Sequence, residues 1–247
     1  MPDTSHLPGA PPPVTLDDHG FFLDLDGTLA PIVEDPTAVE LPLRTRALLE
    51  RLVAETRGAV AVISGRGLAD LDRIMAPLHL PASGSHGVEL RLDAGAMDSA
   101  ELPGLPRDVI DRVEAYATAQ DIAAERKPGA IALHYRKTPD RAEAVRAFVD
   151  ELVRDSEALR ALHGKMVSEV ALQGIDKGHA LARIADSPAF DGRRPVMVGD
   201  DVTDEDGFRA AQARGGFGIK IGDGATAADH RLADVAAFAY WLEDILR

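Results

Sequence analysis

The chain has 247 residues, 45% of them hydrophobic, which allows one large domain or a core with an inserted module. Its formal net charge of −14 argues against nucleic-acid and anionic-membrane partners, because both need clustered lysine and arginine. The absence of cysteine excludes disulfides, zinc–thiolate sites and thiol nucleophiles. With neither a secretory signal nor an apolar run of about 20 residues, we expect a cytoplasmic protein outside the membrane.

The first part of the chain alternates between predicted strands and helices. Residues 1–15 are rich in proline, and we predict that they form a disordered lead-in. Apolar runs and helically spaced leucines then predict strand 21–25, helix 43–56, strand 59–63, helix 68–75 and strand 80–83. This alternation is typical of a parallel sheet that helices cover on both faces.

The middle of the chain has a different pattern. It predicts strand 88–92, helix 109–119, strand 130–136, helix 141–162 and strand 166–172. Strands with one polar face favour an antiparallel sheet. We therefore interpret residues 100–170 as a smaller α+β module that is inserted into the first.

The last part of the chain returns to the first pattern. It predicts helix 177–184, strand 195–199, helix 204–213, strand 217–221 and helix 232–246. These elements continue the parallel alternation of the first part. The predicted fold class is therefore α/β, with a core formed by residues 16–99 and 171–247.

Two acidic clusters follow predicted strands. Asp24 and Asp26 come after the first strand, and Asp200, Asp201 and Asp204 follow a late one. Parallel sheets bind ligands at the carboxyl ends of their strands, and residues two apart in an extended segment point the same way. Each cluster alone could equally well cap a helix. Two clusters at strand ends favour a shared metal site, and carboxylate oxygens suit Mg²⁺.

Phosphoryl transfer also needs hydrogen-bond donors and positive charge around the phosphate oxygens. Ser64 follows the second strand and offers a hydroxyl, while Lys177 opens a helix and offers a charge where anions are favoured. Taken alone, Ser64 is an ordinary turn residue and Lys177 a solvated lysine; their value lies in sharing one sheet edge with the acidic clusters. His86 and His134 are candidates either for substrate contact or for a structural role.

These motifs resemble those of the haloacid dehalogenase superfamily of phosphatases: Asp24–Thr28, Ser64, Lys177 and Gly199–Glu205. Further segments resemble, in the same order, those of trehalose-6-phosphate phosphatases: Ile63–Arg66, Ser85–Glu89, Glu125–Lys127, Leu133–Arg136, Gly164–Glu169 and Asp176–Gly178. The resemblance implies a Rossmann-like parallel-sheet core with an inserted α+β cap. It also implies Mg²⁺-dependent hydrolysis of trehalose 6-phosphate, a step of trehalose biosynthesis.

The resemblance implies a role for each matching residue. Asp24 would attack phosphorus and form an aspartyl-phosphate, while Asp26 would protonate the leaving sugar oxygen and then activate water. Mg²⁺ would be held by Asp24, the backbone carbonyl of Asp26 and Asp200, with Asp201 and Asp204 close behind. The phosphoryl group would be bound by Ser64, Gly65 and Lys177. The sugar would be contacted by Arg66, His86, Glu125, Lys127 and Glu169.

One departure from the family pattern concerns the substrate. Ala171 and Leu172 stand where the family shows a basic residue and a proline. The substrate could therefore be another sugar phosphate, such as sucrose 6-phosphate or a glycosyl phosphoglycerate. A sugar phosphomutase or a non-catalytic sugar-phosphate sensor would share the fold, and Glu125 with Lys127 could form only a solvent-facing ion pair. We expect a monomer whose partner is a small sugar phosphate.

Overall fold

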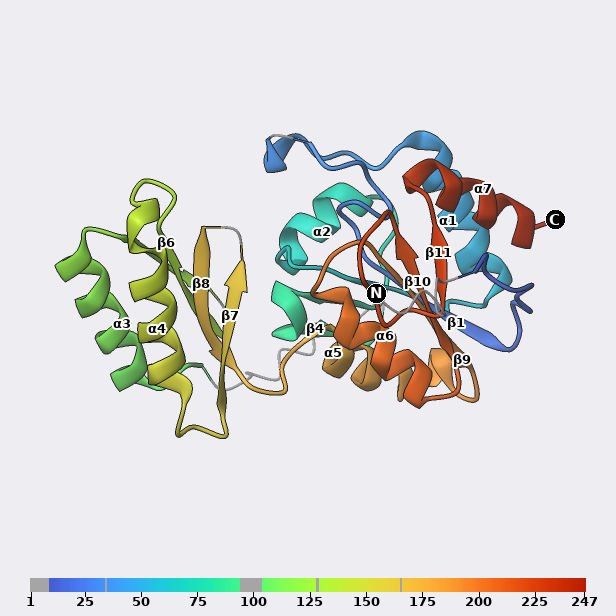
Figure 1. The fold of residues 1–247 in the computed structure, drawn as a ribbon. Helices are drawn as coiled ribbons and strands as arrows, with labels where there is room; N and C mark the ends of the chain where they lie inside the picture. The colour runs from blue at the N-terminus through green and yellow to red at the C-terminus, as the bar shows by residue number, and fades with distance from the viewer. Residues whose placement is uncertain (1–8, 34, 94–103, 128, 165) are drawn as a thin grey trace, which may run out of the picture. The chain divides into compact units, whose positions relative to one another are not determined.

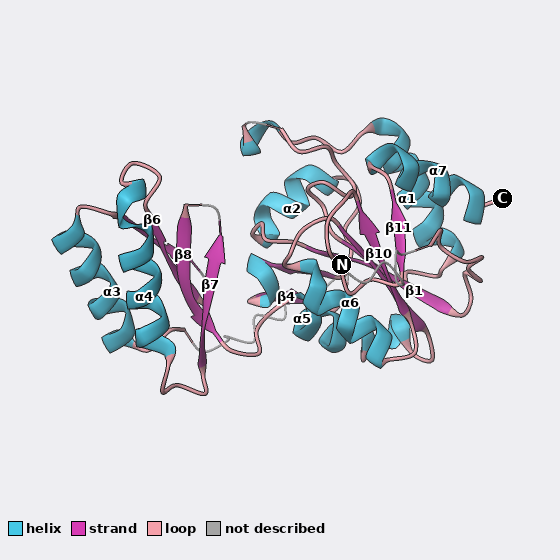
Figure 2. Cartoon of the chain, viewed as in Figure 1, coloured by secondary structure: helices cyan, strands magenta, loops and turns pink. Residues whose placement is uncertain are grey.

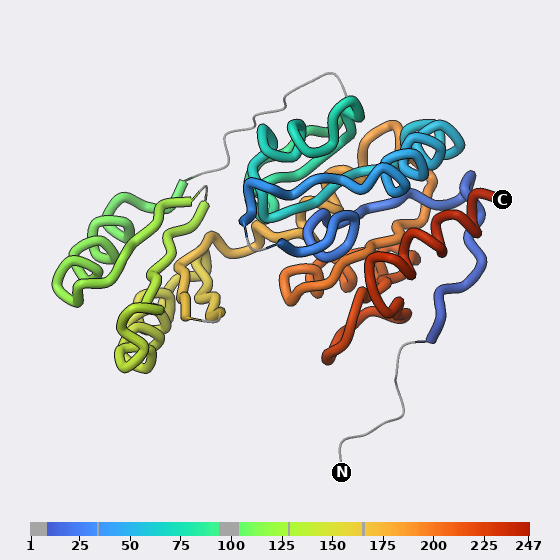
Figure 3. Tube along the Cα trace, turned by 90° about the horizontal axis from the view of Figure 1, so that it is seen from above, coloured from blue at the N-terminus to red at the C-terminus, as the bar shows by residue number. Residues whose placement is uncertain are grey.

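The structure, a computed structural model, describes residues 9–33, 35–93, 104–127, 129–164 and 166–247. The chain divides into two compact units, one from Met1–Ser99 with Asp176–Arg247 and the other from Ala100–Ile175. It leaves the first unit after strand β4 (Glu89–Arg91) and returns to it before helix α5 (Lys177–Ala185), as Figure 3 shows. Within the described ranges, no helix is long and apolar enough to cross a membrane.

A seven-stranded sheet is the frame of the first unit. In spatial order its strands are β11 (His230–Leu232), β10 (Phe217–Ile221), β9 (Arg194–Gly199), β1 (His19–Leu23), β2 (Val60–Ile63), β3 (Ala82–Gly84) and β4. All neighbours pair in parallel except β3 and β4. Because β1 lies between β9 and β2, the residues that follow these three strands, Asp24, Asp200 and Ser64, are placed at one edge of the sheet.

Helices cover both faces of this sheet (Figures 1 and 2). Successive side chains of a strand point to opposite faces, so Phe21 and Leu23 belong to one apolar cluster and Phe22 to another. The first cluster is completed by α1 (Leu43–Glu55), α2 (Leu68–Met75) and α7 (Val235–Ile245). The second is completed by α5 and α6 (Asp204–Ala213). This arrangement confirms the predicted α/β class.

The second unit is a four-stranded antiparallel sheet with two helices packed on it. In spatial order its strands are β5 (Ala123–Lys127), β6 (Ala130–His134), β8 (Val167–Leu172) and β7 (Leu159–Gly164). Helices α3 (Arg107–Gln120) and α4 (Ala142–Val153) contribute Val113 and Val145 to a third apolar cluster, which includes Leu133 of β6. The predicted boundary at residue 170 falls inside β8, so its last residues belong to this sheet.

Helix α4 is shorter than the predicted helix over residues 141–162. It ends at Val153, and the chain then turns, with the Ser156 hydroxyl accepting a hydrogen bond from the backbone N–H of Ala158 at 3.3 Å. The following residues form β7, whose Leu159 is buried in the third cluster. The prediction of one long helix was therefore wrong. The charged residues of the short turn are equally compatible with the polar face of a helix, so the pattern of apolar and polar residues does not show where the helix ends.

The N-terminal segment also differs from its prediction. Gly9 forms a parallel bridge with His230 of β11, and Val14 packs against the first apolar cluster. Residues 9–15 thus follow a defined course, since proline excludes regular helix but allows extended backbone beside an edge strand. Residues 1–8 of the predicted lead-in lie outside the described residues. Short 3-10 helices occur among the described residues at Pro36–Ala38, Ser85–Gly87, Pro139–Arg141 and Pro188–Phe190.

Candidate active site

A buried ion pair joins Asp24 and Lys177 at the carboxyl end of β1. Asp24 follows the strand directly, and its backbone N–H donates to the carbonyl of Val198 in β9 at 2.9 Å. Lys177 is the first residue of α5, and its Nζ donates to Oδ1 of Asp24 and to Oδ1 of Asp204, each at 2.7 Å. The lysine therefore holds Asp24 through one of its two carboxylate oxygens.

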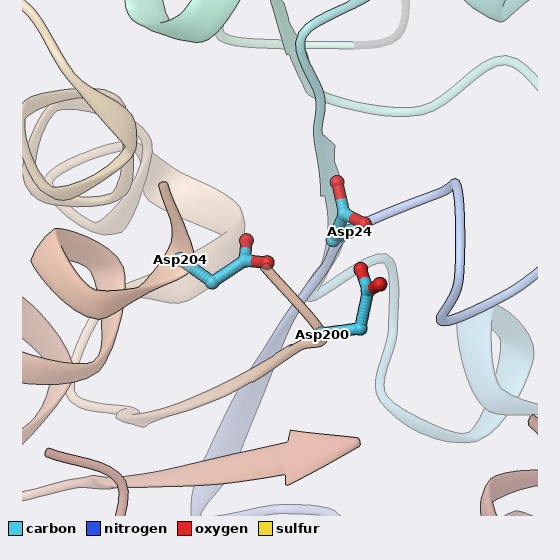
Figure 4. Close-up of side chains that lie close together, drawn as sticks. All are labelled: Asp24, Asp200 and Asp204. Atoms are coloured by element: carbon cyan, nitrogen blue, oxygen red, sulfur yellow. The ribbon is translucent and has the colours of Figure 1, made fainter. Parts of the chain in front are cut away.

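Two further carboxylates, those of Asp200 and Asp204, lie close to that of Asp24 (Figure 4). Asp24, Asp200 and Asp204 each place one carboxylate oxygen so that the three oxygens lie within 4.8 Å of one another. They come from the end of β1, the end of β9 and the first turn of α6. Oδ2 of Asp204 accepts a hydrogen bond from the backbone N–H of Asp201 at 2.9 Å, which fixes the loop between β9 and α6.

Two glycines allow this close approach. Gly27 has φ +83°, and a Cβ added to it would lie 2.2 Å from Oδ2 of Asp200. A Cβ added to Gly199 would lie 2.1 Å from Cγ of Asp204. Separations this short are impossible for real atoms, so any larger residue at either position displaces a carboxylate of the cluster.

Burial and mutual charge interactions shift the pKa values of the groups in this cluster. Burial raises the pKa of Asp24, and the charges of Asp204 and Asp200 raise it further, against the opposing effect of Lys177. Burial, with the charges of Asp204 and Asp201, raises the pKa of Asp200 to about 6. Burial lowers the pKa of Lys177, but the two carboxylates it contacts hold that pKa above its ordinary value. The carboxylates therefore carry more negative charge than Lys177 balances, and an oxygen-only donor set of this kind fits Mg²⁺.

Asp26 is held by Arg66. Nε of Arg66 donates to Oδ2 of Asp26 at 2.6 Å, and Nη2 donates to Oδ1 at 2.8 Å. Nη1 of the same guanidinium donates to Oδ2 of Asp70 at 2.6 Å and to the carbonyl of Pro36 at 2.8 Å. These carboxylates raise the pKa of Arg66, mainly through the Asp26 hydrogen bonds. The guanidinium is thus largely engaged by groups of the protein itself.

The structure brings together only part of the predicted metal set. Among the described residues, the carboxylate cluster contains Asp24, Asp200 and Asp204. The side chain of Asp26 is turned to Arg66, and Asp201 is exposed and contributes its backbone N–H. The predicted use of the Asp26 backbone carbonyl stays a prediction.

Ser64, Gly65 and His86 lie in two packed loops after β2 and β3. The Ser64 hydroxyl is buried and accepts a hydrogen bond from the backbone N–H of Arg66 at 3.2 Å. The backbone N–H of His86 donates to the Ser64 carbonyl at 3.1 Å, and a Cβ on Gly65 would lie 2.5 Å from the His86 ring. The loops therefore bring Ser64 and Gly65, which are predicted to bind phosphate, close to Arg66 and His86, which are predicted to contact the sugar. All four roles stay predictions.

A comparison with known families and proteins identifies the family of this chain. A family model described as trehalose-phosphatase matches residues 22–236. Over 229 residues the chain is 37% identical to the trehalose-6-phosphate phosphatase of Escherichia coli (strain K12), which covers 92% of this chain and 86% of that protein. The chain belongs to the trehalose-phosphatase family.

A further relative and two solved structures also resemble this chain. The probable trehalose-phosphate phosphatase of Sinorhizobium fredii is 38% identical over 209 residues, covering 84% of this chain and 79% of that protein. The solved structure of Aspergillus fumigatus trehalose-6-phosphate phosphatase has a TM-score of 0.71 at 29% identity and covers 93% of each chain. A haloacid dehalogenase-like hydrolase from B. subtilis shares the fold, with a TM-score of 0.68 at 14% identity over 90% of this chain and 98% of that chain. The predicted fold of the core, which is that of haloacid dehalogenase-like hydrolases, is thereby confirmed.

Three of the predicted sugar contacts, Glu125, Lys127 and Glu169, share one face of the second unit's sheet. Glu125 pairs in register with Ala132 of β6. The side chains of both residues point to the face of the sheet opposite to the one on which the helices pack. Lys127 Nζ lies 2.6 Å from Oε1 of Glu169, and His134 Nε2 lies 2.8 Å from Oε2 of Glu125. Glu125 and Lys127 therefore pair with other residues of this face, which offers two acids and two basic groups together.

One residue near the carboxylate cluster escapes prediction from sequence. Lys220 lies in β10 and is buried, and its Nζ donates to the backbone carbonyl of Asp200. The available signal was a lysine inside the apolar run Phe217–Ile221, where a charge is costly to bury. The trehalose-phosphatase site thus holds a second buried ammonium beside that of Lys177.

Proposed function

We propose that this chain hydrolyses trehalose 6-phosphate to trehalose and phosphate, with Asp24 as the nucleophile and Mg²⁺ as the cofactor. The observation that carries the proposal is the cluster of Asp24, Lys177, Asp200 and Asp204 in a chain of the trehalose-phosphatase family. The names of its relatives, which are trehalose-6-phosphate phosphatases, support the substrate. The cytoplasmic location and the monomeric state stay predictions.

In the first step, Oδ2 of Asp24 attacks phosphorus while the bond between phosphorus and the sugar oxygen breaks. An aspartyl-phosphate forms, which splits one difficult displacement into two easier ones. Lys177 orients Asp24 through Oδ1 and presents positive charge to the phosphoryl oxygens. Asp26 follows Asp24 by two residues and gives its proton to the departing sugar oxygen.

In the second step, Asp26 takes a proton from water as the water attacks phosphorus. The bond between phosphorus and Asp24 breaks, which releases phosphate and restores the carboxylate. Asp24, Asp200 and Asp204 would hold Mg²⁺, whose charge stabilises the negative charge that builds up on the phosphoryl oxygens. Arg66 keeps Asp26 in one orientation through both steps.

The remaining predicted residues divide between phosphate and sugar. We assign Ser64 and Gly65, at the carboxyl end of β2, to the phosphoryl group. We assign Glu125, Lys127 and Glu169 to the hydroxyl groups of the sugar, because charged side chains on one sheet face can donate and accept hydrogen bonds together. The hydrogen bonds of Arg66 favour its assignment to Asp26 instead of to the sugar.

A substrate panel tests the proposal. Phosphate release with Mg²⁺ is measured for trehalose 6-phosphate, sucrose 6-phosphate, a glucosyl phosphoglycerate and glucose 6-phosphate, and kcat/KM should be highest for trehalose 6-phosphate. Equal values for trehalose 6-phosphate and glucose 6-phosphate would contradict the proposed substrate. Sugar bisphosphate with little free phosphate would indicate a mutase. The Asp24→Asn variant should release no phosphate, and full turnover by it would contradict the nucleophile.

A further inference from the structure

Lys220 places an ammonium group inside the core at the carboxyl end of β10. Its exposed fraction is 6%, and the two isoleucines beside it, Ile219 and Ile221, both belong to the first apolar cluster. Because side chains alternate along a strand, Lys220 points to the opposite face, which α5 and α6 cover. A lysine in such a place is expensive unless its charge and its hydrogen-bond donors are satisfied.

The contacts of Lys220 lead to the carboxylate cluster. Its Nζ donates to the backbone carbonyl of Asp200 and to that of Ile221, the latter at 2.9 Å. Lys220 also lies opposite Gly199 in the pairing of β10 with β9, and Gly199 immediately precedes Asp200. The ammonium is therefore bound to the backbone from which the Asp200 carboxylate projects toward Asp24.

The charge of Lys220 acts on the same carboxylate. The ammonium of Lys220 and the carboxylate of Asp200 attract each other electrostatically. Both acceptors of the Lys220 ammonium are carbonyl oxygens, which carry no full charge. The favourable charge interactions of this lysine are therefore with the nearby carboxylates.

We propose that Lys220 is a positioning residue for the metal: it anchors the Asp200 backbone and offsets the mutual repulsion of the carboxylates that bind Mg²⁺. This inference rests on the metal site of the proposed function and adds a residue to it. Groups that do not touch the metal but hydrogen-bond to its ligands act mainly on metal affinity. Lys220 should therefore control how tightly Mg²⁺ binds and have little effect on turnover once Mg²⁺ is saturating.

The test is a calorimetric titration of Mg²⁺ into the metal-free wild-type protein and into Lys220→Met and Lys220→Gln. Loss of a group that supports metal ligands typically weakens binding by about 10- to 100-fold, so the Met variant should weaken Mg²⁺ binding by at least about tenfold. The Gln variant keeps an N–H donor but loses the charge, so its affinity should lie between the two. With p-nitrophenyl phosphate, half-saturating Mg²⁺ should rise by the same factor while kcat stays near the wild-type value.

Arg91→Met is the matched control. Arg91 lies in β4 with an exposed fraction of 2%, and it donates to the carbonyl of Leu80 and to the carboxylate of Asp72. It is thus a buried cation of the same sheet that has no contact with the carboxylate cluster. Its loss should lower Tm and leave Mg²⁺ affinity unchanged, which separates general destabilisation from a weakened metal site.

Wild-type Mg²⁺ affinity in a folded Lys220→Met protein would overturn the inference. If that variant does not fold, Lys220→Gln decides, because wild-type affinity without the charge contradicts the proposal equally. A wild-type protein that takes up no Mg²⁺ would overturn the metal site of the proposed function as well. Failure of trehalose 6-phosphate as a substrate leaves these titrations unaffected, so the two proposals can fail separately.

Discussion

Arg66 holds Asp26 by both carboxylate oxygens, with Nε···Oδ2 at 2.6 Å and Nη2···Oδ1 at 2.8 Å. The side chains are 13% and 33% exposed, so the pair is sheltered from solvent. Two parallel hydrogen bonds fix the direction of a carboxylate as well as its position. Asp26 is therefore oriented from the β2 side of the sheet, whereas the neighbouring Asp24 is oriented by Lys177.

Replacement of Arg66 should impair proton transfer more than phosphorus attack. In Arg66→Ala, kcat/KM for trehalose 6-phosphate should fall by about 100-fold, because general acid catalysis contributes roughly 10²- to 10⁴-fold. The loss should be much smaller for p-nitrophenyl phosphate, whose leaving group departs without a proton. The ratio of the two kcat/KM values, measured for wild type and variant, is the readout.

The matched control for this experiment is Arg73→Ala. Arg73 lies in helix α2 and, like Arg66, donates hydrogen bonds to Asp70. Its side chain is exposed and does not contact Asp26. Both substrates should be hydrolysed by this variant at nearly the wild-type rate. Equal losses of Arg66→Ala on the two substrates would show that Arg66 acts on substrate binding or on folding instead of on the proton.

Lys177→Met should destabilise the metal-free protein strongly. The variant leaves Asp24 and Asp204 buried without their shared cation, and breaking a buried ion pair in this way costs about 3–5 kcal/mol. The free energy of unfolding in urea with a chelator present measures the loss. The exposed Lys137→Met should change it by no more than about 0.5 kcal/mol. Similar stabilities of the two variants would refute the proposed importance of this pair.

Gly27→Ala should remove activity through a steric clash. Its Cβ would lie 2.2 Å from Oδ2 of Asp200, so the carboxylate must move and Mg²⁺ binding should weaken. Gly58→Ala separates the clash from backbone strain, because Gly58 has φ +90° but no atom within 4 Å of the added Cβ. Gly58→Ala should lose about 1 kcal/mol of stability and keep full activity. An active Gly27→Ala enzyme with wild-type Mg²⁺ affinity would contradict the close packing.

The stability of the metal-free protein should depend on pH through Asp200. The folded state raises its pKa to about 6, so between the unfolded value of about 3.9 and this value the folded state binds more protons. The free energy of unfolding therefore falls as pH rises through that window. Mg²⁺ binds the ionised carboxylate and offsets this loss.

Thermal unfolding with and without Mg²⁺ measures this effect. The rise in Tm on adding Mg²⁺ should be larger at about pH 7.5 than at about pH 4.5, because protons compete with the metal at low pH. In Asp200→Asn the metal-free protein should lack this contribution to the pH dependence of Tm. A Mg²⁺-induced shift of equal size at both pH values would argue against metal binding by these carboxylates.

The frame of the site could be predicted from sequence because buried parallel strands are continuous apolar runs that end abruptly. Strands β1 and β9 are of this kind, and each is followed by an aspartate, Asp24 or Asp200. Their proximity follows from the pairing of adjacent parallel strands. Helix α2 shows the same clarity: its predicted and observed bounds are both 68–75.

Contacts that depend on side-chain direction could not be predicted. Spacing places Asp26 on the same side as Asp24, but it gives no sign that Arg66, 40 residues away in sequence, holds the Asp26 carboxylate. Strand β5 carries exposed residues along most of its length and shows no apolar run, so only the two-residue spacing of Glu125 and Lys127 indicates a strand there. A lysine inside an apolar run marks Lys220 as unusual, but its hydrogen bond to the backbone carbonyl of Asp200 leaves no trace in a pattern of residue types.

The insertion between β4 and α5 has a consequence for how such enzymes diversify. Residues 100–175 form one contiguous segment, and the carboxylate cluster, Lys177 and Lys220 all come from outside it. A single recombination event that exchanges this segment therefore leaves the reacting groups in the recipient chain. With the sugar contacts assigned to this segment and the phosphoryl chemistry to the carboxylate cluster, as we propose, such an exchange would change the substrate preference and keep the reaction.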